Sequence, residues 1–501
     1  MMELNKVALA SLGAVVAGLV LTKLRTYWDY KVKLSAIPTY GYDGFFTSYI
    51  SAWEFVKHGT KVVQDGYRTF PNQAFKIPLM DRYLVVVSGA DMIEDLRKAE
   101  DDVLDLREAF RELFHSDAMI GPSIGAHFHV DVIQGALTRH LASMFGEVRD
   151  EISRAFEDEI PQTDEWVKVP TLQKILNIVC RTTNRLFVGV PLCRDEEWKA
   201  LNIRYTVEFF VAAGKVNLFP RYMHRLVAWY LSPLKPSLRL ALKHLEPVIR
   251  ERVRRFKAGE EASLEDDLLT WFIQAAPKDS DQWLTPEDLA ARLLVVNMAA
   301  IHTTSQAFTH ALINLASHPE YIEPLRQEME SSIEKDGWSK AAMGKMRMLD
   351  SFLKESQRVS SSGALSIRRM ALKEFVFSNG TVIPAGTIIS ASPSALHFDE
   401  AAYSNPFEFD GFRSYRKREQ EGENLKHQMV TPEPNYVAFG AGKQACPGRF
   451  FAVNEIKALV SYTLLNYDIK IDEADEPPKT EEMGGRIVSN SKTKVMFRKR
   501  Q

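Results

Sequence analysis

The chain has 501 residues, 45% of them hydrophobic, with 63 basic and 65 acidic residues and a net charge of -2. This length and apolar content allow a large buried core, whereas the balanced charge indicates neither nucleic acid nor a strongly acidic substrate as a partner. Three cysteines are too few for a disulfide framework and suit a reducing compartment. No low-complexity linker or repeat divides the chain, so one large domain behind an N-terminal segment is expected.

An uncharged apolar run occupies residues 7–22, and basic residues such as Lys23 and Arg25 follow it. The run is short for a membrane span, which needs about 20 residues, but flanking basic and aromatic side chains can extend it. A cleaved secretory signal is the alternative. The basic residues favour a membrane anchor that leaves the following chain in the cytosol. The expected division is an anchor over 1–26, a hinge over 27–47 and a single domain over 48–501.

Two β-hairpins are expected, one from AFKIPLM and RYLVVVSG on either side of Asp81, the other from FVF and TVI around Asn379 and Gly380. Elsewhere apolar residues recur at helical spacing. They predict helices over 91–115, 131–158, 200–230, 236–258, 286–316, 347–360 and 447–466. The predicted fold class is therefore mainly α with small β-sheets.

The helix that starts after Thr285 is predicted to run to about Ser317, because Thr285 can cap it and Pro286 fits its first turn. At about 1.5 Å per residue, a helix of this length is long enough to cross the whole domain. Its middle is apolar except for a polar cluster at 302–305. Four consecutive polar residues in a buried helix suggest a functional role.

Thr303 and His302 are the two candidates in this cluster, and each has a structural alternative. The Thr303 hydroxyl could bond back to the carbonyl of Ala299, as threonines inside helices often do. His302, as a neutral imidazole, could relay a proton or could be a packed and satisfied histidine.

Glu355 and Arg358 lie three residues apart on one face of the helix predicted over 347–360. On spacing alone such a pair is usually a solvated surface bridge that contributes little to stability.

Cys446 lies in the run FGAGKQACPGRFFA, residues 439–452, immediately before an apolar helical pattern. With Pro447 in the first turn of that helix, the sulfur would lie at the positive end of the helix dipole, where a thiolate is favoured. A buried core cysteine is the alternative. The full spacing F-G-x-G-x-x-x-C-x-G favours a metal-bound thiolate, the ligand of a haem.

Glycines flank Cys446 on both sides. Gly440, Gly442 and Gly448 would let the backbone turn tightly and lie against a flat ligand. Phe439 could pack beside the same ligand.

This run resembles the haem-binding loop of the cytochrome P450 superfamily, F-x-x-G-x-R-x-C-x-G, and the resemblance covers nearly the whole chain after residue 35. It implies the cytochrome P450 fold and a haem b with Cys446 as the axial ligand of the iron. Gln444 stands where the family usually has Arg, or His in many fungal members. Its amide can donate a hydrogen bond to a haem propionate but carries no charge.

The run AAIHTT, residues 299–304, is similar to the family signature (A/G)-G-x-(D/E)-T-T. The resemblance implies that Ala299 and Ala300 open room over the haem and that Thr303 helps to deliver protons to iron-bound oxygen. His302 replaces the acid, as in many fungal relatives, and leaves the proton route open.

The pair Glu355 and Arg358 matches the E-x-x-R of the family, and Arg413 in NPFEFDGFR would be its third partner. The resemblance implies a structural set that locks the haem side of the fold and does not touch substrate.

Further basic residues are candidates for the haem propionates. Arg369 lies where relatives often place such an arginine, though Arg368 could take that role. The family's W-x-x-x-R is not found near the helix at His129, which leaves His129 and Arg139 as candidates.

The resemblance implies a fungal-type haem-thiolate monooxygenase that inserts one oxygen atom of O2 into a lipophilic substrate, such as a terpenoid or similar secondary metabolite. Electrons would come from NADPH through a separate NADPH-cytochrome P450 reductase, because no flavin or dinucleotide domain is recognised in the sequence. It also implies a single-pass protein of the endoplasmic reticulum membrane whose catalytic domain faces the cytosol. The expected pocket walls are mostly apolar and lie at 116–128, 209–219, 299–303, 361–367 and 487–489.

Two alternatives keep Cys446 as a haem ligand. A haem-thiolate isomerase or dehydratase would need no O2, and a non-catalytic haem-binding protein would need no proton delivery. The retention of Thr303 argues against the first, and the polar cluster beside a covered pocket argues against the second.

Overall fold

The long central helix α14, Pro286–Ser317, crosses the molecule and organises the packing around it. The structure is a computed structural model, and it describes residues 18, 21, 24–25, 27–121, 126–475 and 480–501. The other helices are α2 Ser48–Thr69, α3 Ala90–Lys98, α4 Leu106–Phe114, α5 Ser116–Met119, α6 Phe128–Val132, α7 Thr138–His140, α8 Phe145–Glu159, α9 Thr171–Phe187, α10 Glu196–Val216, α11 His224–Leu231, α12 Leu234–Lys257, α13 Leu268–Ala275, α15 Ile322–Asp336, α16 Lys340–Lys345, α17 Arg347–Val359, α18 Pro393–Leu396, α19 Arg413–Arg418 and α20 Arg449–Asn466. The strands are β1 Ala74–Pro78, β2 Tyr83–Val87, β3 Leu104–Asp105, β4 Val167–Pro170, β5 Ser366–Ala371, β6 Phe375–Val376, β7 Val382–Ile383, β8 Ile388–Ala391, β9 Tyr467–Lys470, β10 Thr480–Met483, β11 Arg486–Ser489 and β12 Lys494–Lys499.

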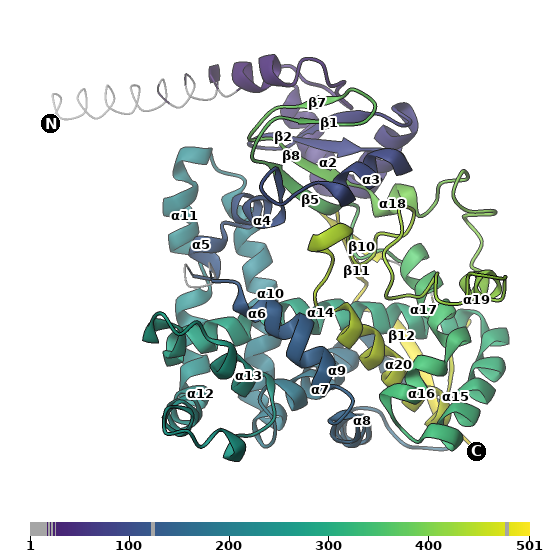
Figure 1. Ribbon diagram of the computed structural model, residues 1–501. Helices are drawn as coiled ribbons and strands as arrows, with labels where there is room; N and C mark the ends of the chain where they lie inside the picture. The colour runs from purple at the N-terminus through teal and green to yellow at the C-terminus, as the bar shows by residue number, and fades with distance from the viewer. Residues whose placement is uncertain (1–17, 19–20, 22–23, 26, 122–125, 476–479) are drawn as a thin grey trace, which may run out of the picture.

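The described strands form small sheets. The largest has the order β1-β2-β8-β5-β3, with β2 parallel to β8 and its other pairs antiparallel. The order β4-β12-β9 gives a second sheet, and β10-β11 and β6-β7 are separate hairpins. Figure 1 places the largest sheet, with α2 and α3, above a helical part that contains α8, α9, α12 and α20. The predicted fold class, mainly α with small β-sheets, is confirmed.

Both predicted hairpins are present. Phe75 pairs with Val86 in the first, and Phe375 pairs with Ile383 in the second. The predicted cap of α14 also forms, since the Thr285 hydroxyl accepts a hydrogen bond of 3.3 Å from the backbone N–H of Asp288.

Three predicted helices differ from the structure. The stretch 91–115 is not one helix, because Leu104 pairs with Ala371 in the sheet and divides it into α3 and α4. The stretch 200–230 divides into α10 and α11 beside Pro220, which cannot continue a helix. The stretch 131–158 is interrupted between α7 and α8.

The segment predicted as a hinge over 27–47 is packed onto the largest sheet from Leu34 onward. Leu34 and Ile37 are 1% and 2% exposed, and they belong to the core beside that sheet. The ammonium group of Lys76 on β1 donates hydrogen bonds to the carbonyl oxygens of both residues. Residues 34–37 are therefore anchored to the domain by buried contacts.

No described helix is long and apolar enough to cross a membrane. The anchor predicted over 1–26 falls mostly outside the described residues.

Candidate functional site

The loop before α20 turns tightly around Cys446. The backbone N–H of Cys446 donates a 2.8 Å hydrogen bond to the carbonyl oxygen of Phe439, which closes the loop. Gly440 and Gly442 have φ angles of 78° and 68°, in the left-handed region that favours glycine. A Cβ atom on Gly442 would also collide with the carbonyl oxygen of Arg97. This glycine is therefore needed both for the turn and for the close approach of the end of α3.

Cys446 lies just before the N-terminus of α20, which starts at Arg449, two residues later than predicted from Pro447. Burial raises the pKa of the Cys446 thiol, while the backbone N–H groups of Gly448 and Arg449 and the Arg449 charge act in the opposite direction. These N–H groups and the positive end of the helix favour a thiolate that is bound to a metal.

The middle of α14 exposes one narrow face. Ala299 and Thr303, one turn apart, have exposed side chains, although Asn297, Ile301 and Thr304 around them are buried. The Thr303 hydroxyl donates a 2.7 Å hydrogen bond to the carbonyl oxygen of Ala299, and the carbonyl of Ala300 is 3.3 Å away. The structural alternative for Thr303 is thus present, and it leaves the hydroxyl on an accessible face.

His302 points in another direction, toward α10. Its Nε2 lies 2.9 Å from the carbonyl oxygen of Ile203, so this nitrogen carries the proton and Nδ1 has the lone pair. Burial lowers the pKa of the imidazole, which is therefore neutral at pH 7. His302 is a satisfied histidine that still has one acceptor nitrogen.

Both ends of the Gln444 amide are engaged with the segment 101–106. Its oxygen accepts from the backbone N–H of Leu106 at 3.0 Å, and its nitrogen donates to Asp101 and to the carbonyl oxygen of Leu104. Gln444 thus ties the Cys446 loop to β3 and α4, and its contact with a propionate stays a prediction.

Arg369 and Arg368 extend from β5 into different surroundings. The guanidinium of Arg369 donates a 3.2 Å hydrogen bond to the carbonyl oxygen of Ala441 in the Cys446 loop. Burial lowers the pKa of Arg369 to about 10, opposed by Asp101 and Asp105. No carboxylate of the described residues forms an ion pair with Arg368, and its pKa is lowered by burial and then by the charge of Arg486. Arg369 is the arginine that the fold brings to the loop.

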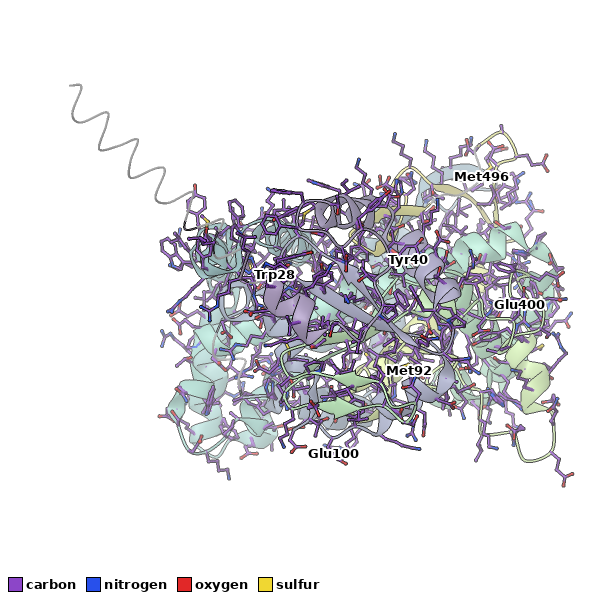
Figure 2. All side chains as sticks on the ribbon, turned by 90° about the horizontal axis from the view of Figure 1, so that it is seen from above. Trp28, Tyr40, Met92, Glu100, Glu400 and Met496 are labelled. Atoms are coloured by element: carbon purple, nitrogen blue, oxygen red, sulfur yellow. The ribbon has the colours of Figure 1, made fainter. Side chains whose placement is uncertain are left out.

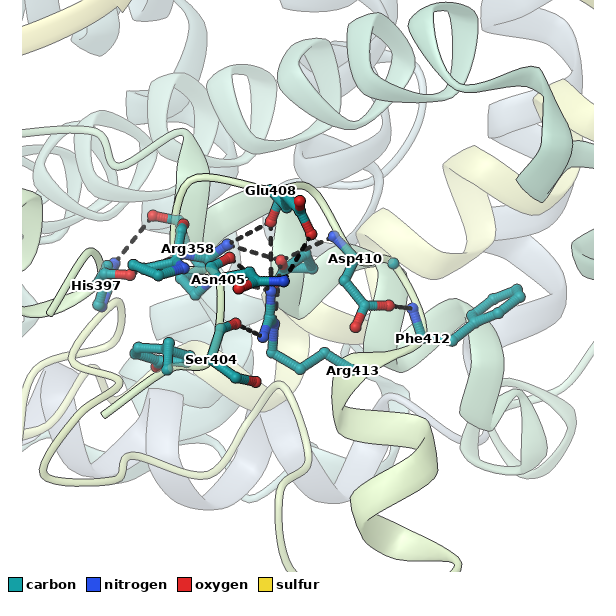
Figure 3. Close-up of polar contacts among 12 residues, drawn as sticks. Arg358, His397, Ser404, Asn405, Glu408, Asp410, Phe412 and Arg413 are labelled. Atoms are coloured by element: carbon teal, nitrogen blue, oxygen red, sulfur yellow. Dashed lines mark hydrogen bonds and ion pairs between the residues drawn. The ribbon is translucent and has the colours of Figure 1, made fainter. Parts of the chain in front are cut away.

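Glu355 holds Arg358 and Arg413 in a buried cluster. Figure 3 shows these two arginines with the residues of the segment before Arg413. It accepts hydrogen bonds of 2.8 and 2.7 Å from Arg358 and one of 3.3 Å from Arg413, and the backbone N–H of Asp410 donates to it at 3.0 Å. Glu355 and Arg358 are only 3% and 1% exposed, so the pair is not a surface bridge.

The remaining donors of the two arginines bind the segment that precedes Arg413. Arg358 donates to the carbonyl oxygens of His397 and Pro406, each at 2.7 Å, and Arg413 donates to that of Ser404 at 2.6 Å. The predicted three residues therefore fasten residues 397–413 to α17.

His129 and Arg139, the remaining basic candidates, are not together. Arg139 is exposed, whereas His129 is buried and lies 2.9 Å from the guanidinium of Arg292 on α14. Burial, aided by Arg292, lowers the pKa of His129 to about 4. Arg292 also pairs with Asp288 at 2.6 Å, so this cluster joins α6 to α14.

The described residues contain no group of three His, Cys, Asp or Glu side chains that could hold a bare metal ion. An iron in a macrocycle needs few protein ligands, and one thiolate at a helix N-terminus can supply the axial ligand.

The sequence model of the family described as Cytochrome P450 matches residues 50–497. The chain belongs to the cytochrome P450 family.

Relatives with known names agree with this assignment. The chain is 39% identical over 478 residues to cytochrome P450 monooxygenase 71 of Postia placenta, which covers 93% of this chain and 94% of the relative. It is 35% identical over 457 residues to cytochrome P450 monooxygenase olcJ of Penicillium canescens, with 89% and 85% covered. The solved structure of retinoic acid bound cyanobacterial CYP120A1 has a TM-score of 0.69 and 19% identity, and covers 90% of this chain and 96% of its own. The protein is a cytochrome P450 monooxygenase with relatives in fungi.

The residues at the site fit a haem-thiolate cofactor, which the family implies. Cys446 offers a soft sulfur donor, the N–H groups of Gly448 and Arg449 can bond that sulfur, and Arg369 offers a buried cation beside the loop. Ala299 provides a small side chain on the exposed face of α14.

Two groups of interest were not predicted. Glu455 on α20 is buried and accepts hydrogen bonds from Thr182 and Thr183 on α9, at 3.1 and 2.9 Å. Arg486, which opens β11, lies over the ring of Phe210. A pocket wall was predicted at 487–489, and Arg486 immediately precedes it in the turn GGR. This position next to the predicted wall is the one sequence signal that could have identified Arg486.

Proposed function

We propose that this cytochrome P450 inserts one oxygen atom of O2 into a lipophilic substrate, with electrons from NADPH supplied by a separate reductase and with haem b as cofactor. The observation that carries the proposal is the exposed face of α14, where the Thr303 hydroxyl is accessible in the middle of an otherwise buried helix. An isomerase or a haem carrier would have no use for an accessible hydroxyl at that place.

The residues of the chain have separate tasks in this proposal. Cys446 would hold the haem iron, and when bound the haem supplies the oxygen chemistry, which a thiolate ligand favours. The Thr303 Oγ1 would accept a hydrogen bond from a water or a protonated group on the substrate side, since its own hydrogen is donated to the carbonyl of Ala299 and its lone pairs stay free. The lone pair on Nδ1 of His302 would be one acceptor through which a proton could be resupplied.

Aromatic side chains support a lipophilic substrate. Phe114, Phe209 and Phe210 form a cluster in which ring centroids lie 4.9 to 6.1 Å apart. Phe209 is buried behind the other two rings, and Phe114 and Phe210 are half-buried. Their rings would bind apolar surface and offer little to a small polar molecule. A terpenoid or a similar secondary metabolite is the substrate class that we propose.

Exposed aromatic and apolar residues support residence at the endoplasmic reticulum membrane with the catalytic domain in the cytosol. Trp28, Phe46, Trp229 and Tyr230 are 58%, 78%, 61% and 79% exposed. Arg221, just before α11, donates a 3.0 Å hydrogen bond to the Tyr30 hydroxyl. This contact joins the N-terminal segment that carries Trp28 to the segment that carries Trp229 and Tyr230. In Figure 2 Trp28 lies toward one end of the molecule, and Glu400 and Met496 lie toward the other. Tryptophan and tyrosine suit the membrane interface.

The proposed electron donor is NADPH-cytochrome P450 reductase, and the proposal is tested by reconstitution. The purified haem-loaded protein is incubated with a lipophilic substrate, NADPH and the reductase, and each of O2 and reductase is then omitted. We expect hydroxylated product only in the complete mixture. Equal conversion without O2 or without the reductase would overturn the monooxygenase reaction.

A further inference from the structure

Arg486 lies against the aromatic cluster that forms one wall of the predicted substrate pocket. Its guanidinium carbon is 3.5 Å from the ring centroid of Phe210 on α10. Phe210 in turn meets Phe114 and Phe209 edge to face, at 5.5 and 4.9 Å. One side of the cation is thus covered by apolar surface, where the cation–π contact replaces part of its hydration.

Arg368 on β5 is a second cation in the same neighbourhood. The hairpin β10-β11 is joined to the residues just before β5. Gly363 forms a β-bridge with Arg486, and the N–H of Ala364 donates a 2.8 Å hydrogen bond to the carbonyl oxygen of Gly485. Burial lowers the pKa of Arg486 to about 10. Burial and then the charge of Arg486 lower the pKa of Arg368 to about 10.

Strand β11, which begins with Arg486, also packs against α14. After the larger effect of burial, the charge of Arg486 contributes to the lowered pKa of His302, which neighbours Thr303 on α14. Arg486 is therefore close to the residues that are proposed to act on the substrate.

No carboxylate in the described part of the chain forms an ion pair with Arg368 or Arg486, and none contributes to the pKa of either. The other arginines that are buried in the described part of the chain do have such partners, except Arg369, which donates to the backbone carbonyl of Ala441 in the Cys446 loop. Such pairs include Arg82 with Asp81, Arg252 with Asp267, Arg292 with Asp288, Arg358 with Glu355 and Arg418 with Asp350. Two neighbouring, partly desolvated cations without an anion are unfavourable, and a bound anion would relieve this cost.

We propose that Arg368 and Arg486 bind the carboxylate of a lipophilic acid, and that such acids are the substrate class of this enzyme. The planar guanidinium groups match the two oxygens of a carboxylate. The half-buried rings of Phe114 and Phe210, with Phe209 packed behind them, would hold the apolar body. The inference rests on the proposed function, because it names the substrate class of the same pocket. A haem propionate is the other carboxylate that could reach these arginines, and the experiment separates the two sources.

The first measurement separates haem from substrate. Arg486→Gln is compared with Arg204→Gln, which makes the same change on α10 at an exposed pair with Glu208. Haem content is measured from the absorbance of the pyridine complex, and thermal unfolding by circular dichroism. We expect full haem content in both variants and an unfolding midpoint that is unchanged or higher in Arg486→Gln. Loss of haem would show that Arg486 serves a propionate, and a lower midpoint with haem retained would show that it has a partner in the protein; either result overturns the proposal.

The second measurement uses matched neutral and acidic probes. Dodecanoic acid and abietic acid, each with its methyl ester, are titrated into the ferric holoenzyme, followed by the haem absorbance shift and by calorimetry. We expect each acid that binds to do so at least about tenfold more tightly than its ester, and Arg486→Gln to remove that preference while leaving ester binding within about threefold. Arg486→Lys should restore part of the preference because it keeps the charge.

Equal affinity for acids and esters, binding of esters alone, or an acid preference that survives Arg486→Gln would each overturn the arginine site. Ester turnover that depends on O2 and the reductase would in that case leave the proposed function in place. Conversely, an acid preference with turnover that needs neither O2 nor the reductase would reject the monooxygenase reaction and keep the site.

Discussion

Thr303 donates its hydroxyl to the carbonyl oxygen of Ala299, 2.7 Å away and one turn earlier in α14, while its side chain stays exposed. In a helix interior this bond satisfies the hydroxyl locally and needs no partner from elsewhere. The same bond leaves the two lone pairs of Oγ1 free to accept, so the hydroxyl can hold a water or a protonated ligand group on the exposed face. A local bond and a catalytic role are therefore compatible at this position.

Replacing Thr303 with alanine should uncouple NADPH consumption from product formation. The helix keeps its backbone hydrogen bonds, so we expect the carbonmonoxy spectrum to be unchanged. The fraction of NADPH that yields product should fall by about a hundredfold, the lower end of a typical proton-transfer contribution. The ratio of product to NADPH consumed is the measurement.

Thr303→Ser restores the hydroxyl and should recover most of the coupling. Thr309→Ala is the matched control, since it removes a buried hydroxyl from the same helix that has no hydrogen-bond partner among the described residues. Unchanged coupling in Thr303→Ala would remove this hydroxyl from the reaction.

Substituting Cys446 with serine should abolish the red-shifted carbonmonoxy band of a thiolate-ligated ferrous haem. A neutral hydroxyl cannot replace a thiolate as a soft, anionic donor. Cys193→Ser is the control, because Cys193 is buried and burial raises the pKa of its thiol to about 11. A red-shifted band that persists in Cys446→Ser would show that another residue ligates the iron.

Glu355→Ala should destabilise the protein strongly, because it leaves the buried guanidinium groups of Arg358 and Arg413 without their carboxylate. Breaking a buried ion pair from one side costs about 3 to 5 kcal/mol. We expect a large fall in the denaturant midpoint and a loss of haem retention, with substrate selectivity unchanged in the fraction that keeps haem.

The chain offers a matched control for Glu355. Glu94 and Arg97 form the same i, i+3 ion pair at 2.6 Å, but their side chains are 29% and 44% exposed. Glu94→Ala should change the free energy of unfolding by about 1 kcal/mol or less, since exposed pairs contribute little. Similar effects of the two substitutions would contradict the assignment of Glu355 to a buried structural core.

The sequence was sufficient where a short segment determines its own structure. The hairpin around Asp81, the cap at Thr285 and the turn that holds Cys446 each depend on residues that are neighbours in the chain. The extended strand alternation, the capping hydroxyl and the glycines act locally, so they can be recognised without the fold.

What could not be predicted depends on contacts between distant segments. Leu104 becomes a strand because Ala371 pairs with it, and Gln444 binds Leu106, more than three hundred residues away in the chain. The sequence could not show that Arg486 lacks a carboxylate partner among the described residues, because its neighbours come from distant segments of the chain. Sequence spacing also could not decide whether Glu355 and Arg358 are exposed or buried, since the same i, i+3 pair occurs on the surface at Glu94 and Arg97.

Glu455 should make the protein less stable as the pH rises from 4.5 to 7. Burial raises the pKa of its carboxyl group from 4.5 to about 7, although Thr183 and Thr182 donate hydrogen bonds to it. One oxygen of the group is buried without a hydrogen-bond partner among the described residues, which suits a neutral acid better than a carboxylate. In this pH range the folded state holds a proton that the unfolded state has lost. Stability from this group is therefore full below pH 4.5 and is lost as the pH rises to about 7.

Glu455→Gln removes this titration, because the amide is neutral at every pH. Relative to the wild type, the variant should gain about 2 to 3 kcal/mol of unfolding free energy between pH 5 and pH 8, because the wild type loses this stabilisation over about two pH units of that range, at about 1.4 kcal/mol each. The measurement is the unfolding midpoint of both proteins across that range at one scan rate. Because only the change of the difference with pH is used, any constant effect of the amide on packing cancels. A difference that stays the same from pH 5 to pH 8 would show that Glu455 is already ionised at the lower pH, with a partner that stabilises its charge.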